Sequence, residues 1–296
     1  MTQETGQSST PTTSGGEAPL RVFFRRLMRH RSGQVGLLGV LFIIMLVFFG
    51  PDLTSKSPTA VSPSATLIPP SVAFPFGTDQ LGRDVLTRIL YGAVLSLSLG
   101  LFPVAFAAAV GVPIGVVVGY SERIDLVVMR ILDVAMAVPA LILALAVIAV
   151  LGPGLNQIML ALGIAWFPYY ARMARGQVVQ AKTSGYVEYA VSAGSGDGRI
   201  MFVHLLQSVA APIIVMMSIG VGDAILSGSA LSFIGLGAPP PTPEWGAILR
   251  DGREFLRIAW WISVFPGLAI VLTVVAFNLL GDALRDTLDP RIRRVG

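Results

Sequence analysis

Six stretches of the sequence, each at least twenty residues long, contain no Asp, Glu, Lys or Arg. A helix needs roughly 20 apolar residues to cross the hydrocarbon core of a bilayer, because its own hydrogen bonds satisfy the backbone there. Only 13% of the residues are charged, against about 25% in soluble proteins. The chain is therefore predicted to be an all-α integral membrane protein. The stretches are 32–51, 89–121, 134–171, 200–222, 224–243 and 258–281.

The turn signals within these stretches give the number of spans. The segment 151–154 reads Leu-Gly-Pro-Gly and divides the longest stretch into two helices joined by a tight hairpin. The two stretches beside Asp223 count as one span, because the second ends in the proline-rich segment 235–243, which cannot continue a helix. Six transmembrane helices are predicted, near 33–50, 91–118, 130–150, 155–171, 209–235 and 258–281.

The distribution of Lys and Arg predicts the orientation of these spans. With the N-terminus inside the cell, 15 of the 21 cationic residues lie in the inside segments, as the positive-inside rule requires. Both termini are therefore expected in the cytoplasm. The predicted organisation is a disordered cytoplasmic tail (1–19), an N-terminal region with the first span (20–50), an extracytoplasmic loop (51–90), a transmembrane core (91–281) and a cytoplasmic tail (282–296).

Three glycines, Gly111, Gly115 and Gly119, recur at four-residue spacing in the second span. Small residues on one face of a helix allow a neighbouring helix to approach closely. We expect this face to be a packing surface in preference to a gate.

Several kinds of chemistry are excluded by residues that the chain lacks. A phosphate-binding P-loop needs Gly-Lys-Ser or Gly-Lys-Thr, whereas Lys56 follows Ser55 and Lys182 follows Ala181. With two His and no Cys, no metal site is expected, and the Gly-x-Ser-x-Gly nucleophile motif is missing. We expect no catalytic residues and no bound cofactor. The net charge of +4 is assigned to topology and to anionic membrane lipid, and not to nucleic acid, because no basic face with interleaved aromatic residues is present.

Ionisable residues inside the predicted spans are few. Asp223 lies well within a span, and Arg130 and Asp133 stand three residues apart at the start of the third, where they can pair on one helix face. An ion-coupled carrier places ionisable groups at the middle of the membrane. An ion-coupled secondary transporter is therefore an alternative function.

The segment 171–208 carries the most informative pattern outside the spans. Helix-favouring residues at 188–193 are followed by Gly194, Gly196 and Gly198, and then by an apolar stretch that enters the membrane. A short helix with a glycine turn that projects from the bilayer suits docking onto a cytoplasmic partner. An ordinary surface helix with a glycine C-cap explains the same pattern.

An ordered set of motifs carries a resemblance to a known family. Glu188-x-Ala190-x-x-x-Gly194, followed by Asp197, is similar to the EAA loop of ABC-importer permeases. Across residues 22–294 the chain resembles the C-type permease of the oligopeptide/dipeptide/nickel group. Further motifs of the set are Gly77–Asp84, Met129–Asp133, Leu151–Gly154, Leu231–Gly237, Pro240–Gly246 and Asn278–Asp282.

The resemblance implies a type I ABC-importer permease fold in the bacterial cytoplasmic membrane. The expected partners are a second, B-type permease, two cytoplasmic ATPases that hold ATP and Mg, and an extracytoplasmic substrate-binding protein. The expected cargo is a dipeptide or oligopeptide, with nickel chelates and haem as alternatives within the same group. The chain itself is not expected to be an enzyme.

The resemblance also implies a coupling loop, residues 171–208, that contacts an ATPase. Tyr189 stands where the family usually has a second Ala, which predicts a matched ATPase surface. Gln207 and Ser208 replace the usual Pro-Asn, which predicts a more continuous return helix. The residues expected to couple to the ATPase are Glu188, Tyr189, Ala190, Gly194 and Asp197.

Two further sets of residues have expected roles. Asp223, with Met217 and Ser227, is expected on the translocation path, where the acid meets a cationic group or the N-terminal amine of the cargo; a structural Asp bonded to a neighbouring helix is the alternative. The outer segment 236–257 reads either as a solvated loop or as the docking surface for the binding protein. The resemblance favours docking, through Glu244, Trp245 and Arg250.

Overall fold

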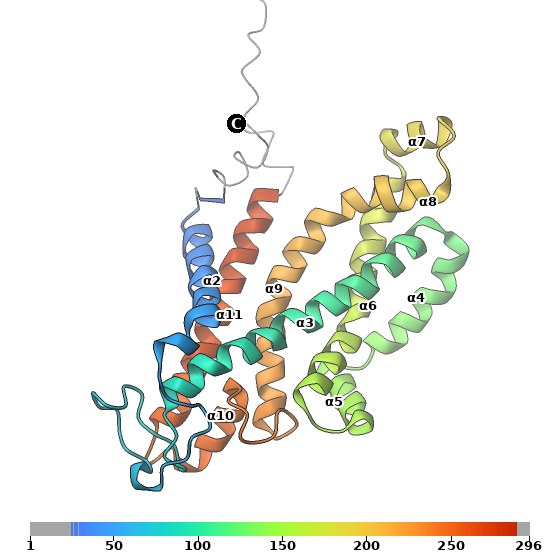
Figure 1. Ribbon diagram of the computed structural model, residues 1–296. Helices are drawn as coiled ribbons and strands as arrows, with labels where there is room; N and C mark the ends of the chain where they lie inside the picture. Colours follow the sequence, from blue (N-terminus) through green and yellow to red (C-terminus); the bar gives the residue numbers. More distant parts are fainter. Residues whose placement is uncertain (1–24, 26, 29, 289–296) are drawn as a thin grey trace, which may run out of the picture.

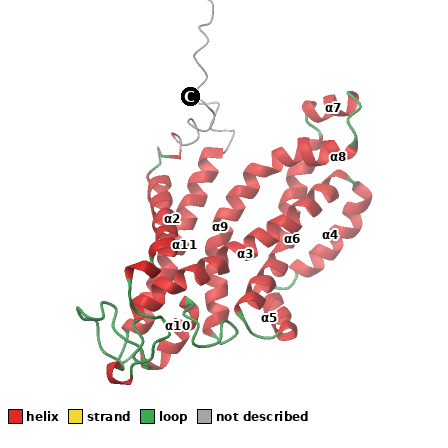
Figure 2. Ribbon diagram, viewed as in Figure 1, coloured by secondary structure: helices red, strands yellow, loops and turns green. Residues whose placement is uncertain are grey.

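The computed structural model describes residue 25, residues 27–28 and residues 30–288, which are largely helical and contain no strand (Figures 1 and 2). The disordered tail predicted at 1–19 lies outside these described residues. Three short helices are α7 (Gly185–Ser192), α8 (Asp197–Arg199) and α10 (Trp245–Gly252). The longer helices are α2 (Arg31–Phe49), α3 (Val85–Tyr120), α4 (Glu122–Met136), α5 (Ala140–Leu151), α6 (Leu155–Lys182), α9 (Leu206–Phe233) and α11 (Trp261–Leu288).

The long helices connect two ends of the molecule, which differ in what they carry (Figure 1). One end, called here the α7 end, holds α7 and α8 together with the start of α2 and the end of α11. The opposite end, called the α10 end, holds α10 and the loop that joins α2 to α3. α11 packs against both α2 and α9, and α3 packs against α6 and α9.

Four helical segments are long and apolar enough to span a membrane: α2, α3, the segment Asp197–Phe233 that contains α9, and α11. α4 and α5 make a fifth candidate if the bent pair is one span. α6 has 28 residues but is not among these candidates, since Asn156, Gln157 and several aromatic residues lower its hydropathy. The described chain is thus a multi-pass helical membrane protein with four or five candidate spans.

The third predicted span is bent. α4 and α5 meet at an angle of 87°, and the break falls at residues 137–139, immediately before the first residue of α5. Pro139 explains the break, because proline has no backbone N–H to donate and disfavours a helical conformation at Val138. The second span also starts earlier than predicted, at Val85, and Asp84 caps it by accepting a hydrogen bond from the Thr87 backbone N–H.

The glycine face of α3 packs against α6, as its spacing predicts. A Cβ on Gly111 or on Gly115 would collide with backbone carbonyl oxygens of α6, and one on Gly119 would lie 2.8 Å from Cβ of Val178. The absence of side chains at these positions therefore brings the two backbones together.

The tight hairpin predicted at 151–154 separates α5 from α6. Gly152 and Gly154 both adopt positive φ, at 84° and 153°, where a Cβ would be strained. The Gly154 N–H donates a hydrogen bond of 2.9 Å to the carbonyl oxygen of Leu236. The hairpin is thereby attached to the segment that follows α9.

A buried ion network organises the α10 end. The Asp79 carboxylate accepts hydrogen bonds of 2.6 Å from Arg83 Nε and from Arg88 Nη1. All three side chains are at most 2% exposed. Asp251 of α10 lies 3.6 Å from Arg83 and 3.8 Å from Arg88. Because removal of one partner would leave an uncompensated buried charge, this network ties the loop before α3 firmly to α10.

Candidate coupling and translocation sites

α7 protrudes from the bundle (Figure 1), and the burial of its side chains divides it into two faces. Val187 and Ala190 are buried, and Val187 belongs to the main hydrophobic core. Tyr189 is 77% exposed and Tyr186 is 48% exposed, and Glu188 is also exposed. The small and apolar residues of α7 therefore pack against the rest of the chain, whereas two tyrosines and a glutamate face outward. Of the residues expected to contact an ATPase, Ala190 faces inward.

A glycine turn ends α7. Gly194 has φ of +77°, its N–H bonds the Val191 carbonyl at 3.0 Å, and the Ser195 N–H bonds the Ala190 carbonyl at 3.1 Å. This pair of bonds around a left-handed residue is a Schellman motif. No atom would lie within 4 Å of a Cβ on Gly194, so backbone conformation, and not crowding, selects glycine there.

The coupling loop is attached to the end of α3. The Tyr120 hydroxyl donates a 2.6 Å hydrogen bond to Oδ1 of Asp197, and Lys182 Nζ donates one of 2.9 Å to the Tyr120 carbonyl. The backbone then returns through a π-helical turn, Ile200–Leu205, directly into α9. Gln207 and Ser208 lie within the continuous helical segment, as the loss of the usual proline predicts.

The ion pairs beside the coupling loop differ from the predicted pair. Asp133 pairs with Arg172 of α6, so the expected pairing with Arg130 is wrong. Asp125 forms a two-point pair with Arg175, with both N–O distances 2.6 Å. Spacing along one helix could not reveal these partners, because α6 lies against α4 only in the folded chain.

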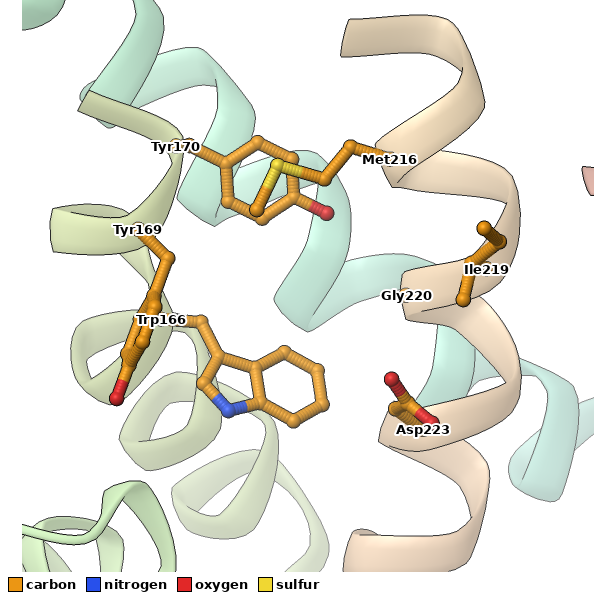
Figure 3. Close-up of a pocket in the computed structure, with 7 residues that line it drawn as sticks. All are labelled: Trp166, Tyr169, Tyr170, Met216, Ile219, Gly220 and Asp223. Atoms are coloured by element: carbon orange, nitrogen blue, oxygen red, sulfur yellow. The ribbon is translucent and has the colours of Figure 1, made fainter. Parts of the chain in front are cut away.

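Asp223 lies at a cavity of about 300 Å³ between α6 and α9 (Figure 3). The described residues include no hydrogen-bond or ion-pair partner for it. Met217 and Ser227, expected beside it on the path, are not among the residues that line this cavity. The aromatic wall of the cavity was not predicted, although the run Trp-Phe-Pro-Tyr-Tyr at 166–170 is a signal for it. The lining consists of Trp166, Tyr169, Tyr170, Met216, Ile219, Gly220 and Asp223.

A second, larger cavity of about 820 Å³ continues toward the α7 end. It shares Met216 and Ile219 with the first cavity and reaches Arg285 and Leu288 near the end of α11. The two cavities border each other at Met216 and Ile219, and together they are called the hollow here.

The outer segment is held together by residues that were expected to dock a partner. Glu244 is fully buried and caps α10, accepting hydrogen bonds from the backbone N–H groups of Gly246 at 2.7 Å and Ala247 at 2.9 Å. Burial raises the pKa of Glu244, and these hydrogen bonds offset part of the rise. Trp245 is 2% exposed, and its indole N–H bonds the Ile89 carbonyl. Because both side chains point into the chain, neither forms its outer surface.

Arg250, the third residue expected to dock the binding protein, lies on α10 and pairs with Asp251 at 3.1 Å. Its side chain is 20% exposed. It therefore belongs to the rim of the buried ion network and keeps limited access to the outside.

Comparison with known proteins agrees with this architecture. Residues 111–294, more than half of the chain, match the family described as binding-protein-dependent transport system inner membrane component. Residues 18–70 match the N-terminal transmembrane domain of oligopeptide transport permease C. The chain belongs to this family of membrane permeases, which are subunits of ABC importers.

Particular relatives match along nearly the whole chain. The dipeptide transport system permease protein DppC of Alkalihalophilus pseudofirmus is 42% identical, over 93% of this chain and 91% of its own length. The di/tripeptide transport system permease protein DppC of Pseudomonas aeruginosa is 40% identical, over 93% of each. The dipeptide permease DppC of Escherichia coli is 41% identical, over 93% of this chain and 94% of its own.

Proposed function

We propose that the chain forms half of the translocation pathway of an ABC importer for dipeptides and oligopeptides. The observation that carries the proposal is α7, which projects beyond the bundle with Tyr186, Glu188 and Tyr189 outward. Exposed aromatic residues on a protruding helix suit a protein partner. The names of the relatives, which are dipeptide and di/tripeptide permeases, support the cargo class.

The proposed membrane arrangement has six spans, with α4 and α5 together as the third and α6 as the fourth. In this arrangement the α7 end and both termini lie in the cytoplasm. The positions of the start of α2 and the end of α11 at the α7 end (Figure 1) support an even number of crossings.

ATP bound by two partner ATPases would drive the cycle, because this chain has no P-loop. When the ATPases close, α7 moves with them. The movement reaches α3 through the Tyr120–Asp197 hydrogen bond and reaches α9 through the turn Ile200–Leu205. The hollow that contains Asp223 then alternates between the two sides of the membrane as this chain and a B-type permease rock against each other.

A substrate-binding protein would dock at the α10 end and release peptide into this hollow. The buried Glu244, Trp245 and ion network give that end a fixed shape. Arg250, with its limited access, remains the residue of the predicted docking set that can contact the partner directly.

Transport by the reconstituted assembly tests the proposal. The chain is purified with its partner permease, ATPases and binding protein, and uptake of dialanine into proteoliposomes is measured. We expect uptake that needs ATP and is abolished by vanadate. Uptake driven by an ion gradient without ATP would identify a secondary transporter instead. A binding protein that carries nickel chelate or haem, together with no uptake of dialanine, would reject the peptide cargo.

A further inference from the structure

Asp223 of α9 faces a cavity whose other lining residues are aromatic or apolar. Its carboxylate is exposed to the cavity between α6 and α9, and the part of the chain that is described offers it no ion pair or hydrogen bond. An ionisable group at membrane depth that faces an internal cavity marks a substrate or ion pathway. The described chain therefore supplies no positive charge to pair with Asp223. A cationic group of the cargo can supply one.

The wall opposite Asp223 is aromatic (Figure 3). The indole of Trp166 extends from α6 across the cavity toward Asp223, and the hydroxyl of Tyr170 points toward α9. Gly220 permits this approach, because a Cβ there would lie 2.8 Å from the Tyr170 hydroxyl oxygen. The glycine on α9 thus makes room for the tyrosine on α6.

A carboxylate that faces aromatic rings selects an organic cation. The carboxylate attracts the positive charge and accepts its hydrogen bonds, while the face of an indole or phenol ring attracts a cation through its quadrupole. The cavity, at about 300 Å³, is at the lower end of the size range of small-ligand sites. It suits the terminal residue of a peptide, whose protonated amine is such a cation.

We propose that Asp223 and Trp166, with Tyr170 buried behind them, form a recognition site for the protonated N-terminal amine of the transported peptide. This inference rests on the proposed peptide-import function and goes beyond it by naming the part of the cargo that is held. Met216 and Ile219 border both cavities, so the larger cavity adjoins the site on the side of the α7 end. The peptide would then bind at this site transiently, after its release by the binding protein and before it leaves at the α7 end.

The test measures peptide binding without the binding protein, which would otherwise impose its own selection. The probes are dialanine and N-acetyl-dialanine, the second of which lacks the ammonium group. Equilibrium dialysis against the purified membrane assembly gives their affinities for the wild type, Asp223→Asn and Asp223→Glu. Asp282→Asn, an exposed acid on α11, is the matched control.

We expect Asp223→Asn to weaken dialanine binding by about 10- to 100-fold, the effect of losing a charged hydrogen-bond partner. Asp223→Glu should restore most of the affinity, and Asp282→Asn should leave it unchanged. N-acetyl-dialanine should bind weakly and equally to all variants. Trp166→Leu should weaken the affinity for dialanine by about 3- to 10-fold. Trp166→Phe should weaken it less, because phenylalanine keeps an aromatic ring face.

Two results would overturn the inference. Unchanged dialanine affinity in Asp223→Asn would show that the acid does not hold the amine. Loss of the second permease from the purified Asp223→Asn assembly would show that the acid pairs with that subunit. ATP-driven uptake of dialanine by the wild type separates these results from a failure of the peptide function itself, in which no variant would transport the peptide.

Discussion

The Tyr120 hydroxyl donates a 2.6 Å hydrogen bond to the Asp197 carboxylate, and so joins the last residue of α3 to the first residue of α8. The two residues are 77 positions apart in the sequence. This bond and the Lys182–Tyr120 contact give α3 a direct attachment to the coupling loop. The end of α3 is therefore bonded to the chain on both sides of α7, at Lys182 before it and at Asp197 after it.

Replacement of Tyr120 by Phe should uncouple ATP hydrolysis from uptake without unfolding the chain. The change removes one exposed hydrogen bond, which contributes about 0.5–1.5 kcal/mol, and leaves the ring beneath Lys182. We expect fewer peptides transported per ATP hydrolysed, measured as the ratio of the two rates in proteoliposomes. Tyr91→Phe, near the other end of α3, is the control; equal ratios in both variants would mean that the Tyr120–Asp197 bond carries no coupling.

Replacement of Gly194 by Ala should loosen the end of α7. The left-handed backbone at Gly194 costs an L-residue about 1–2 kcal/mol, although a Cβ would meet no neighbouring atom. We expect faster hydrogen exchange of the α7 amides and reduced co-purification of the ATPases. Gly196 is a matched control, because its φ is −68° and its surroundings are equally open. If Gly196→Ala had the same effect, the conformational explanation would be wrong.

Replacement of Asp79 by Asn should destabilise the α10 end. Arg83 and Arg88 would lose their shared carboxylate at a buried site, a change that costs about 3–5 kcal/mol. We expect a clear fall in the thermal midpoint of the detergent-purified assembly. Asp52→Asn, at an exposed position, should leave the midpoint unchanged, and a similar midpoint for both variants would show that the network contributes no stability.

Glu244 should make stability depend on pH. Its pKa is raised in the folded chain, mainly by burial, so folding disfavours the charged form. The free energy of unfolding should therefore fall as pH rises from the ordinary glutamate value of 4.5 through the raised value, and stay low above it. Below the ordinary value Glu244 is protonated in both the folded and the unfolded state, so the free energy of unfolding no longer depends on pH through this residue.

The Glu244→Gln variant isolates this effect. Gln does not titrate, so wild type should lose thermal stability relative to this variant as pH rises, whatever constant offset the amide introduces. Glu254→Gln, at an exposed residue, provides the control. Parallel midpoint curves for wild type and Glu244→Gln between about pH 4 and pH 8 would contradict the assigned burial effect.

Local patterns predicted the features that depend on local conformation. The hairpin glycines Gly152 and Gly154, the turn at Gly194 and the packing face beginning at Gly111 all appear where the sequence places them. In each case a glycine indicates either a backbone conformation with positive φ or a close approach of two helices. A single sequence is enough to show such a glycine.

Features that depend on contacts between distant segments were not predictable in the same way. Asp133 pairs with Arg172, across two helices, and not with Arg130. Trp166 faces Asp223 only because α6 packs beside α9. Glu244 looks like an exposed loop acid in the sequence, but it turns inward to cap α10. The hydrophobic pattern of a sequence predicts how long a helix is. It does not predict which other helices pack against it.

The most direct test of the proposed function is a cross-link between α7 and an ATPase. The chain has no cysteine, so Tyr189→Cys introduces a single reactive thiol on the outward face of α7, and Val72→Cys places one on an exposed residue of the loop at the α10 end. With a short bifunctional thiol–amine reagent, Tyr189→Cys should cross-link to an ATPase and Val72→Cys should not. Normal ATP-driven uptake by Tyr189→Cys with no cross-link to an ATPase would contradict the central claim that α7 couples this permease to its energy source.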